Sequence, residues 1–150
     1  MTLSIYSDDY FMKQALKEAQ KAYEQKEVPV GAVVVCNNKI IARAHNSTEL
    51  LTDVTAHAEM LAITAASNHL GSKYLNDCTL YVTVEPCTMC AGAIQWAQVG
   101  KVVFATPDEK SGFLRFGKEL LHPKTKLEMG VLAGEAKNMM QRFFIERRKK

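Results

Sequence analysis

Long apolar runs are missing from this sequence of 150 residues, and none approaches the roughly 20 residues that a helix needs to span a bilayer. The first residues also lack the basic stretch followed by an apolar one that marks a secretory signal. Internal repeats and low-complexity segments are absent as well. These absences exclude membrane-spanning and repeat classes, and we expect a cytoplasmic protein with no membrane partner.

Neither sign of charge dominates, because 19 Lys and Arg residues are balanced by 16 Asp and Glu residues to a net charge of +3. So small an excess does not decide whether the protein binds nucleic acid. The last nine positions are nevertheless basic, with Arg142, Arg147, Arg148, Lys149 and Lys150. This cluster fits either a solvated helix end or an RNA contact.

The hydrophobic fraction of 47% and the charged fraction of 23% are those of an ordinary globular protein. At this length we expect a single domain over residues 1–150 with a substantial core. Only four cysteines are present. In a reducing compartment, two of them, Cys36 and Cys78, are expected to be small buried residues and not a disulfide.

Helical and strand patterns alternate along the chain. Helices are predicted at 7–27, 56–71, 87–98 and from 134 onward, and strands at 30–36, 39–44, 79–84, 101–105 and within 124–132. Residues 107–123 fit neither pattern. The alternation predicts an α/β fold: a three-layer α/β/α sandwich with a mixed central sheet of about five strands, mostly parallel after an antiparallel hairpin. The apolar stripe of the last helix is expected to pack in the core; it comprises Ala136, Met139, Met140, Phe143 and Phe144.

One imidazole and two thiols form the most informative pattern, as His57 in Thr-Ala-His-Ala-Glu and as Cys87 and Cys90 in Glu-Pro-Cys-Thr-Met-Cys. Nitrogen and sulfur ligands of this kind suit zinc. Cys87 and Cys90 are one helical turn apart, so their sulfurs project to the same side. Structural zinc sites use four protein ligands and catalytic sites use three plus water, and three ligands therefore predict a catalytic zinc.

Glu59 follows His57 by two residues, where its carboxylate can move protons to and from a zinc-activated water. The sequence thus predicts a zinc hydrolase with an activated water and a glutamate proton shuttle.

The cysteines are compatible with two other interpretations. A Cys-x-x-Cys pair can be a thioredoxin-like redox centre, but this leaves His57 and Glu59 without a use. A structural zinc site would need a fourth ligand, for which His45, His69 and Cys78 are available. That interpretation also leaves Glu59 unexplained.

His-x-Glu followed by Pro-Cys-x-x-Cys resembles the zinc-dependent nucleoside and nucleobase deaminases. The run from Thr79 to Ile94, the segment from Val28 to Val33, Asn46 and the pair Thr55-Ala56 resemble the bacterial tRNA-specific adenosine deaminases in particular. The resemblance extends from about Tyr10 to Phe104, weakens, and returns in the last helix. It implies a cytidine deaminase-like fold and hydrolytic deamination. In that reaction the zinc-activated water attacks the carbon that bears an exocyclic amine, and Glu59 passes a proton to a ring nitrogen and then helps to protonate the departing ammonia.

By this resemblance the substrate is a tRNA anticodon stem-loop, in which adenosine at wobble position 34 becomes inosine after the base is flipped out. The expected substrate contacts are an amide, two pocket-wall residues, a backbone N–H and two residues near the flanking nucleotides, namely Asn46, Pro29, Val30, Ala58, Asp108 and Lys110. The resemblance also implies a homodimer, with Met89, Ile94 and Trp96 as candidate contacts.

The chain departs from the family where the relatives carry a basic residue near Gln98 and a Gly-Ala-Arg-Asp type of run at 105–108. The following loop is replaced by residues 111–116. These changes spare the zinc ligands and affect the segment that would border the RNA. Two alternatives are therefore kept: a deaminase of a free base or nucleoside, of guanine or cytosine type, and a non-catalytic RNA-binding subunit stabilised by zinc.

Overall fold

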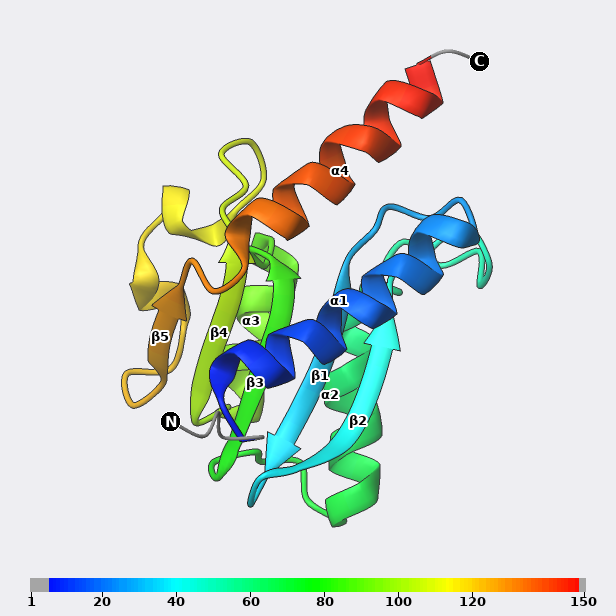
Figure 1. Ribbon diagram of the computed structural model, residues 1–150. Helices are drawn as coiled ribbons and strands as arrows, with labels where there is room; N and C mark the ends of the chain where they lie inside the picture. Colours follow the sequence, from blue (N-terminus) through cyan, green and yellow to red (C-terminus); the bar gives the residue numbers. More distant parts are fainter. Residues whose placement is uncertain (1–5, 149–150) are drawn as a thin grey trace, which may run out of the picture.

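A computed structural model describes residues 6–148 of the chain (Figure 1). Its elements in order are α1 (Asp8–Glu24), β1 (Gly31–Cys36), β2 (Lys39–His45), α2 (Ala58–Leu70), β3 (Cys78–Val84), α3 (Thr88–Ala97), β4 (Lys101–Thr106), the short 3-10 helices η1 (Phe113–Arg115) and η2 (Lys118–Leu120), β5 (Lys126–Met129) and α4 (Ala133–Arg148). The predicted helices and strands are all present, and residues 107–123 contain only the two short helices.

The five strands form one mixed sheet in the order β2-β1-β3-β4-β5. β1 pairs antiparallel with both β2 and β3, whereas β3–β4 and β4–β5 are parallel. The predicted mixed sheet, mostly parallel after an antiparallel hairpin, is therefore confirmed, because β2, β3, β4 and β5 run in one direction and only the hairpin strand β1 runs in the other. α2 carries the chain from β2 across to β3, and β1 lies between these two strands.

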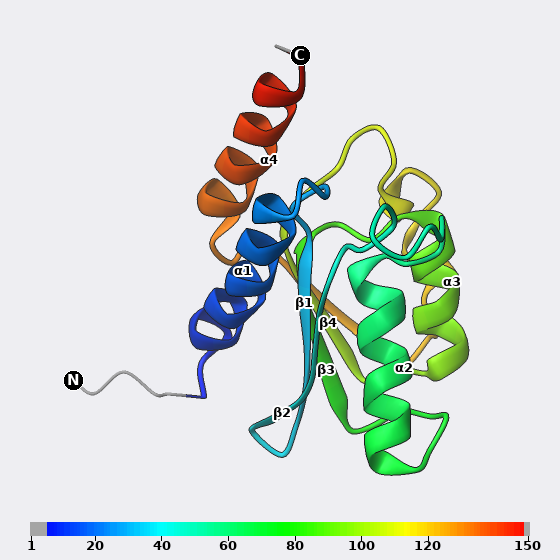
Figure 2. The ribbon, with the colours of Figure 1, turned by 90° about the vertical axis from the view of Figure 1, so that its right-hand side faces the viewer.

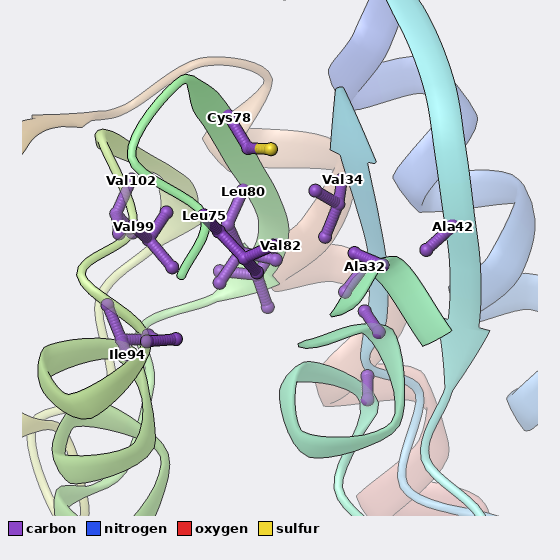
Figure 3. Packing of buried hydrophobic residues seen from close by; sticks show 14 of the residues in the cluster. Ala32, Val34, Ala42, Leu75, Cys78, Leu80, Val82, Ile94, Val99 and Val102 are labelled. Carbon is purple, nitrogen blue, oxygen red and sulfur yellow. The ribbon is translucent and has the colours of Figure 1, made fainter. Parts of the chain in front are cut away.

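Helices cover both faces of the sheet, as Figure 2 shows, with α1 and α4 on one side and α2 and α3 on the other. Alternate residues of β1 point to opposite faces. Val33 and Val35 pack under α1 with Phe11 and Met12, and Ala32 and Val34 belong to the larger cluster under α2 and α3 (Figure 3). The three-layer α/β/α sandwich predicted from the sequence is confirmed.

Two asparagines turn β1 into β2, with φ of 53° at Asn37 and 63° at Asn38, as a two-residue hairpin of the left-handed kind requires. Cys36 lies directly opposite Cys78 on the neighbouring strand β3. Both thiols are free; Cys78 is buried and Cys36 is half-buried.

α1 begins after Ser7, whose hydroxyl oxygen accepts a hydrogen bond from the Tyr10 N–H at 3.1 Å. The helix ends at Glu24, three residues before the predicted end. It packs directly on β1 at Gly31, where any side chain would collide with the backbone of Ala15 and Ala19. This close approach fixes the start of β1 against the helix.

Glu18 is a carboxylate of α1 that is only 3% exposed. It accepts hydrogen bonds from Lys21 at 2.9 Å and Arg43 at 3.2 Å, and lies 3.4 Å from His45 Nδ1. Burial raises the pKa of Glu18, but the hydrogen bonds of Lys21 and His45 and the charges of Lys21 and Arg43 outweigh burial, so that the pKa lies below its ordinary 4.5. The ionised carboxylate therefore stabilises the fold.

Replacing Glu18 by glutamine is expected to lower the free energy of unfolding by about 1–2 kcal/mol at pH 7. Because the folded-state pKa lies below the unfolded value, this stabilisation is present above the unfolded pKa and disappears as the pH falls through the folded pKa. In urea unfolding measured from pH 7 to pH 3, the difference in free energy of unfolding between wild type and variant should therefore decrease. A gap that is constant with pH would contradict the ionic origin, and Glu24→Gln on the exposed side of α1 is the control.

The last helix extends beyond the sheet in Figure 1, and its apolar stripe is only partly in the core. Ala136 and Phe143 are buried, with Phe143 against Tyr23 at a ring-centroid distance of 6.0 Å, but Phe144 is 39% exposed. The prediction that the whole stripe packs in the core was thus wrong at its outer end. Within residues 6–148, no helix has the length and apolar character that crossing a membrane requires.

Candidate active site

The change of strand direction at β1 brings several chain segments to one end of the sheet. β2, β3 and β4 end there, and β1 begins there. The residues that follow or precede these strand ends therefore meet: Asn46 after β2, Val30 before β1, Glu85 after β3 and Asp108 beyond β4. α2 and α3 also begin at this end, and helix N-termini carry partial positive charge.

The three predicted zinc ligands lie together at this point. His57 is the N-cap of α2, Cys87 is the N-cap of α3, and Cys90 is in the first turn of α3. His57 Nδ1 is 3.6 Å from Cys87 Sγ and 3.5 Å from Cys90 Sγ. All three ligand atoms lie within 4.8 Å of one another.

These distances fit a tetrahedral zinc ion. A Zn–S bond of about 2.3 Å and a Zn–N bond of about 2.05 Å at the tetrahedral angle separate sulfur and nitrogen by about 3.6 Å. The two observed S···N distances, 3.6 and 3.5 Å, agree with this value. His57, Cys87 and Cys90 are therefore positioned to bind zinc.

The proposed fourth ligands of a structural site lie elsewhere. His45 is next to Glu18 and Gln25, His69 is exposed in the last turn of α2, and Cys78 is at the opposite end of β3. In the described part of the chain, His57, Cys87 and Cys90 form the only group of three or more potential metal ligands. A three-ligand site with a position left for water is the arrangement of catalytic zinc.

The pKa values of the three ligands are shifted in different directions. The hydrogen bond with the Cys90 thiol lowers the pKa of Cys87 to about 4, and His57 adds to this effect. The same hydrogen bond, together with burial, raises the pKa of Cys90. The hydrogen bond to Cys87 raises the pKa of His57. Because zinc binds deprotonated ligands, zinc binding at this site releases protons.

Glu59 is the second residue of α2 and is only 4% exposed. Burial raises the pKa of its carboxyl to about 7, and the negative charge of Cys87 acts in the same direction. A carboxyl that titrates near neutral pH is suited to accept and return protons. The side chain faces the pocket that the zinc ligands line.

A cavity of about 240 Å³ lies over the ligands. Four of the predicted substrate contacts line it: Val30, Asn46, Ala58 and Asp108. Pro29 is buried and does not line the cavity, whereas Val28 does. Because side chains alternate along an extended segment, Val28 and Val30 face the cavity together and Pro29 faces away.

A groove of about 1070 Å³ adjoins the cavity and contains Lys110, the remaining predicted contact. Cavity and groove share Val28, Val84, Asp108, Ser111 and Met140 in their linings. The groove also carries three cationic residues of α4: Lys137, Arg147 and Arg148. Of the basic cluster at the end of the sequence, Lys149 and Lys150 lie outside the described residues.

Sequence reasoning missed several residues of the cavity: Thr48, Val84, Glu85, Ser111 and Met140. The helical spacing of Met140 predicts a core position, but such spacing cannot distinguish a core residue from one that lines a cavity. Glu85 precedes Pro86-Cys87 directly, so its place beside the metal ligands could have been found from the motif.

The loop after β2 is held by a buried carboxylate. Glu27 is 2% exposed, and its oxygens accept hydrogen bonds from the Leu50 N–H at 2.8 Å and the Glu49 N–H at 3.2 Å. The Thr48 hydroxyl also donates to it at 3.4 Å. Glu27 thereby fixes the segment next to Asn46 at the cavity wall.

The homodimer contacts suggested by the sequence differ in their exposure. Trp96 on α3 is 81% exposed, while Ile94 on the same helix is completely buried in the core between α3 and the sheet. Ile94 therefore cannot contribute to a surface contact, and its selection was wrong. Met89 is half-buried.

Comparison with known proteins agrees with this geometry. Residues 5–106 match the family model of the cytidine and deoxycytidylate deaminase zinc-binding region. A tRNA-specific adenosine deaminase of Aquifex aeolicus is 46% identical over 141 residues, covering 91% of this chain and 93% of the relative.

Two solved structures are also similar. A structure from a study of A-to-I editing by tRNA:A34 deaminases has a TM-score of 0.82 and 40% identity over 87% of this chain and 98% of its own. A guanine deaminase of Bacillus subtilis has a TM-score of 0.65 and 40% identity, over only 67% of this chain and 65% of its own. The chain belongs to the zinc-binding cytidine and deoxycytidylate deaminase family and, within it, to the tRNA-specific adenosine deaminases.

Proposed function

We propose that this protein, a single deaminase domain over residues 1–150, hydrolyses adenosine to inosine at position 34 of a tRNA anticodon. The observation that carries the proposal is a small cavity over the zinc ligands that adjoins a large groove with basic residues. The cavity of about 240 Å³ is smaller than the roughly 300–1,000 Å³ of most ligand pockets. A single flipped base suits the cavity, and the rest of an RNA strand must lie in the groove.

The charges of the groove support a nucleic-acid substrate. Lys110, Lys137, Arg147 and Arg148 line it, against Asp108 and Glu109. Lysine and arginine side chains bind phosphates and fix the register of a strand without reading its sequence. Phe144 lies in the same groove and is 39% exposed, which leaves a ring face on which an unpaired base can stack.

His57, Cys87 and Cys90 would hold zinc, which lowers the pKa of a water molecule from about 15.7 toward about 7. Glu59 takes a proton from the attacking water and gives it to the ring nitrogen beside the amino-bearing carbon. It then helps to protonate the leaving amine, so that adenosine and water yield inosine and ammonia. As the first residue of α2, Ala58 has a backbone N–H with no partner inside the helix, and this N–H can bind the base.

Asn46 is 7% exposed and lines the cavity at the end of β2. Its backbone N–H donates to the Val30 carbonyl at 3.0 Å, so the two residues keep a fixed spacing. In the proposed complex, the Asn46 amide binds the nucleoside and Val30 packs against the base. Asp108 and Lys110 contact the neighbouring nucleotides.

A second candidate is favoured by one observation, the 40% identity with a guanine deaminase. Purified zinc-loaded protein should be assayed on an anticodon stem-loop with adenosine 34 and on free adenosine, cytidine, guanine and cytosine. We expect inosine in the RNA alone, with a KM that rises steeply with salt because phosphate contacts are lost. Turnover of a free base alone, with a KM independent of salt, would show that the substrate is a free base and not tRNA. RNA binding without turnover of any substrate would establish a non-catalytic subunit.

We also propose that the protein acts in the cytoplasm as a homodimer. Support comes from Trp96 and Tyr74, which are 81% and 41% exposed and line one surface pocket. Large apolar side chains exposed near one another favour a protein contact. Light scattering of the same preparation should give the mass of two chains, and a mass of one chain would remove the dimer.

A further inference from the structure

Glu85 is a buried carboxylate between the end of β3 and the metal ligand Cys87. The residue is 6% exposed, and its backbone N–H donates to the Thr106 carbonyl at 2.8 Å. Among residues 6–148 no lysine, arginine or histidine forms an ion pair with it. A buried charge without a cation must be stabilised by hydrogen bonds.

Both carboxylate oxygens are bound by backbone N–H groups of the segment that follows β4. Oε1 accepts from the Asp108 N–H at 3.0 Å, and Oε2 accepts from the Leu114 N–H at 2.9 Å. Hydrogen bonds to an ionised acceptor are about twice as strong as neutral ones. Glu85 thus joins the two ends of segment 108–114.

The rest of segment 108–114 is folded around this carboxylate. The Phe113 N–H donates to the Pro86 carbonyl at 2.9 Å, and the Gly112 N–H donates to the Asp108 carbonyl at 2.8 Å. A side chain at Gly112 would collide with the Glu85 carboxylate and with the Asp108 backbone carbonyl. Asp108 in turn accepts from the Ser111 N–H at 3.1 Å, so the positions of Asp108 and Ser111 depend on the Glu85 contact.

Asp108 and Ser111 form one wall of the cavity over the zinc ligands. We propose that Glu85 is a positioning residue, which sets this wall through backbone hydrogen bonds and so controls substrate binding and not the chemical step. The inference rests on the proposed function only in taking the cavity as the substrate site. It holds for an RNA and for a free base alike.

Glu85→Gln is the sharpest test because the side chains have the same shape. Glutamine can accept one of the two N–H bonds, but its amide nitrogen is a donor and cannot accept the other. We expect KM for the wild-type substrate to rise about tenfold, with kcat changed less than about threefold and zinc content unchanged. By NMR hydrogen exchange, the amide of Asp108 or Leu114 should exchange at least about tenfold faster.

Glu119→Gln removes the same charge from an exposed side chain on η2 and is the matched control. Glu85→Asp keeps the charge but withdraws the carboxylate by one methylene from both N–H groups, and should reproduce both the KM rise and the faster exchange if Glu85→Gln does not fold. A higher KM with unchanged exchange would overturn the proposal, because Glu85 would then bind the substrate directly. Loss of zinc together with kcat would also overturn it, and an inactive wild type would instead refute the proposed function.

Discussion

Replacing Glu59 by alanine should leave zinc bound and reduce turnover by about 10³-fold. Positioned proton transfer contributes about 10²–10⁴-fold to an enzymatic rate, and Glu59 is a buried carboxylate in the first turn of α2 that lines the cavity beside the metal ligand His57. Burial raises the pKa of its carboxyl to about 7. Alanine has no group that can accept and return a proton. Single-turnover deamination and metal analysis of the same sample measure the two effects.

Glu59→Gln keeps the volume of the buried side chain and should be as inactive as the alanine variant, which separates proton transfer from packing. Glu24→Ala, at an exposed position of α1, should retain full activity. Should Glu59→Ala lose its metal and keep residual turnover, the assignment of Glu59 as the proton carrier would be wrong.

Removal of a zinc ligand is expected to have the second large effect. Cys87→Ala leaves two ligands, and a pair cannot hold zinc at a catalytic geometry. Zinc present at about 1,000 times its Kd stabilises the folded state by about 4 kcal/mol, which corresponds to roughly 10 °C in Tm for a chain of this size. Cys87→Ala should therefore contain no stoichiometric zinc, melt about 10 °C lower and be inactive.

The wild-type protein treated with a chelator should melt at the same temperature as Cys87→Ala. Cys36→Ala removes a thiol on β1 that is outside the ligand group and should keep its zinc. Stoichiometric zinc in Cys87→Ala would contradict the ligand set and reopen the search for another donor.

The elements and the ligand group could be predicted because their signals are local. Helical spacing, β-branched runs and the two asparagines of the first turn act within a few residues of one another, and so do the motifs of His57 and of Cys87 and Cys90. The three ligands come from two motifs and still predict one zinc site, because all ligands of a metal ion must lie close together. For a helical side chain such as Met140, no similar constraint in the sequence tells whether it faces the core or a cavity.

The remainder depends on contacts between distant segments. The direction of β1 relative to β3 follows from the crossover of α2, which a strand pattern does not contain. Segment 107–123 lacks periodicity because it is organised by Glu85 and by the burial of Phe113, which is completely inaccessible to solvent. Met140 and Val28 line the cavity because the fold brings them next to segments that are distant in the sequence.

The metal ligands and most of the cavity wall come from different chain segments. His57, Glu59, Cys87 and Cys90 come from 57–90, whereas most of the wall comes from 28–30, 46–48, 108–111 and α4. Substrate choice can therefore change without change in the metal ligands, provided that Glu85 and the backbone N–H groups it binds are kept. An engineered exchange of 107–116 that keeps these hydrogen bonds offers the same route in the laboratory.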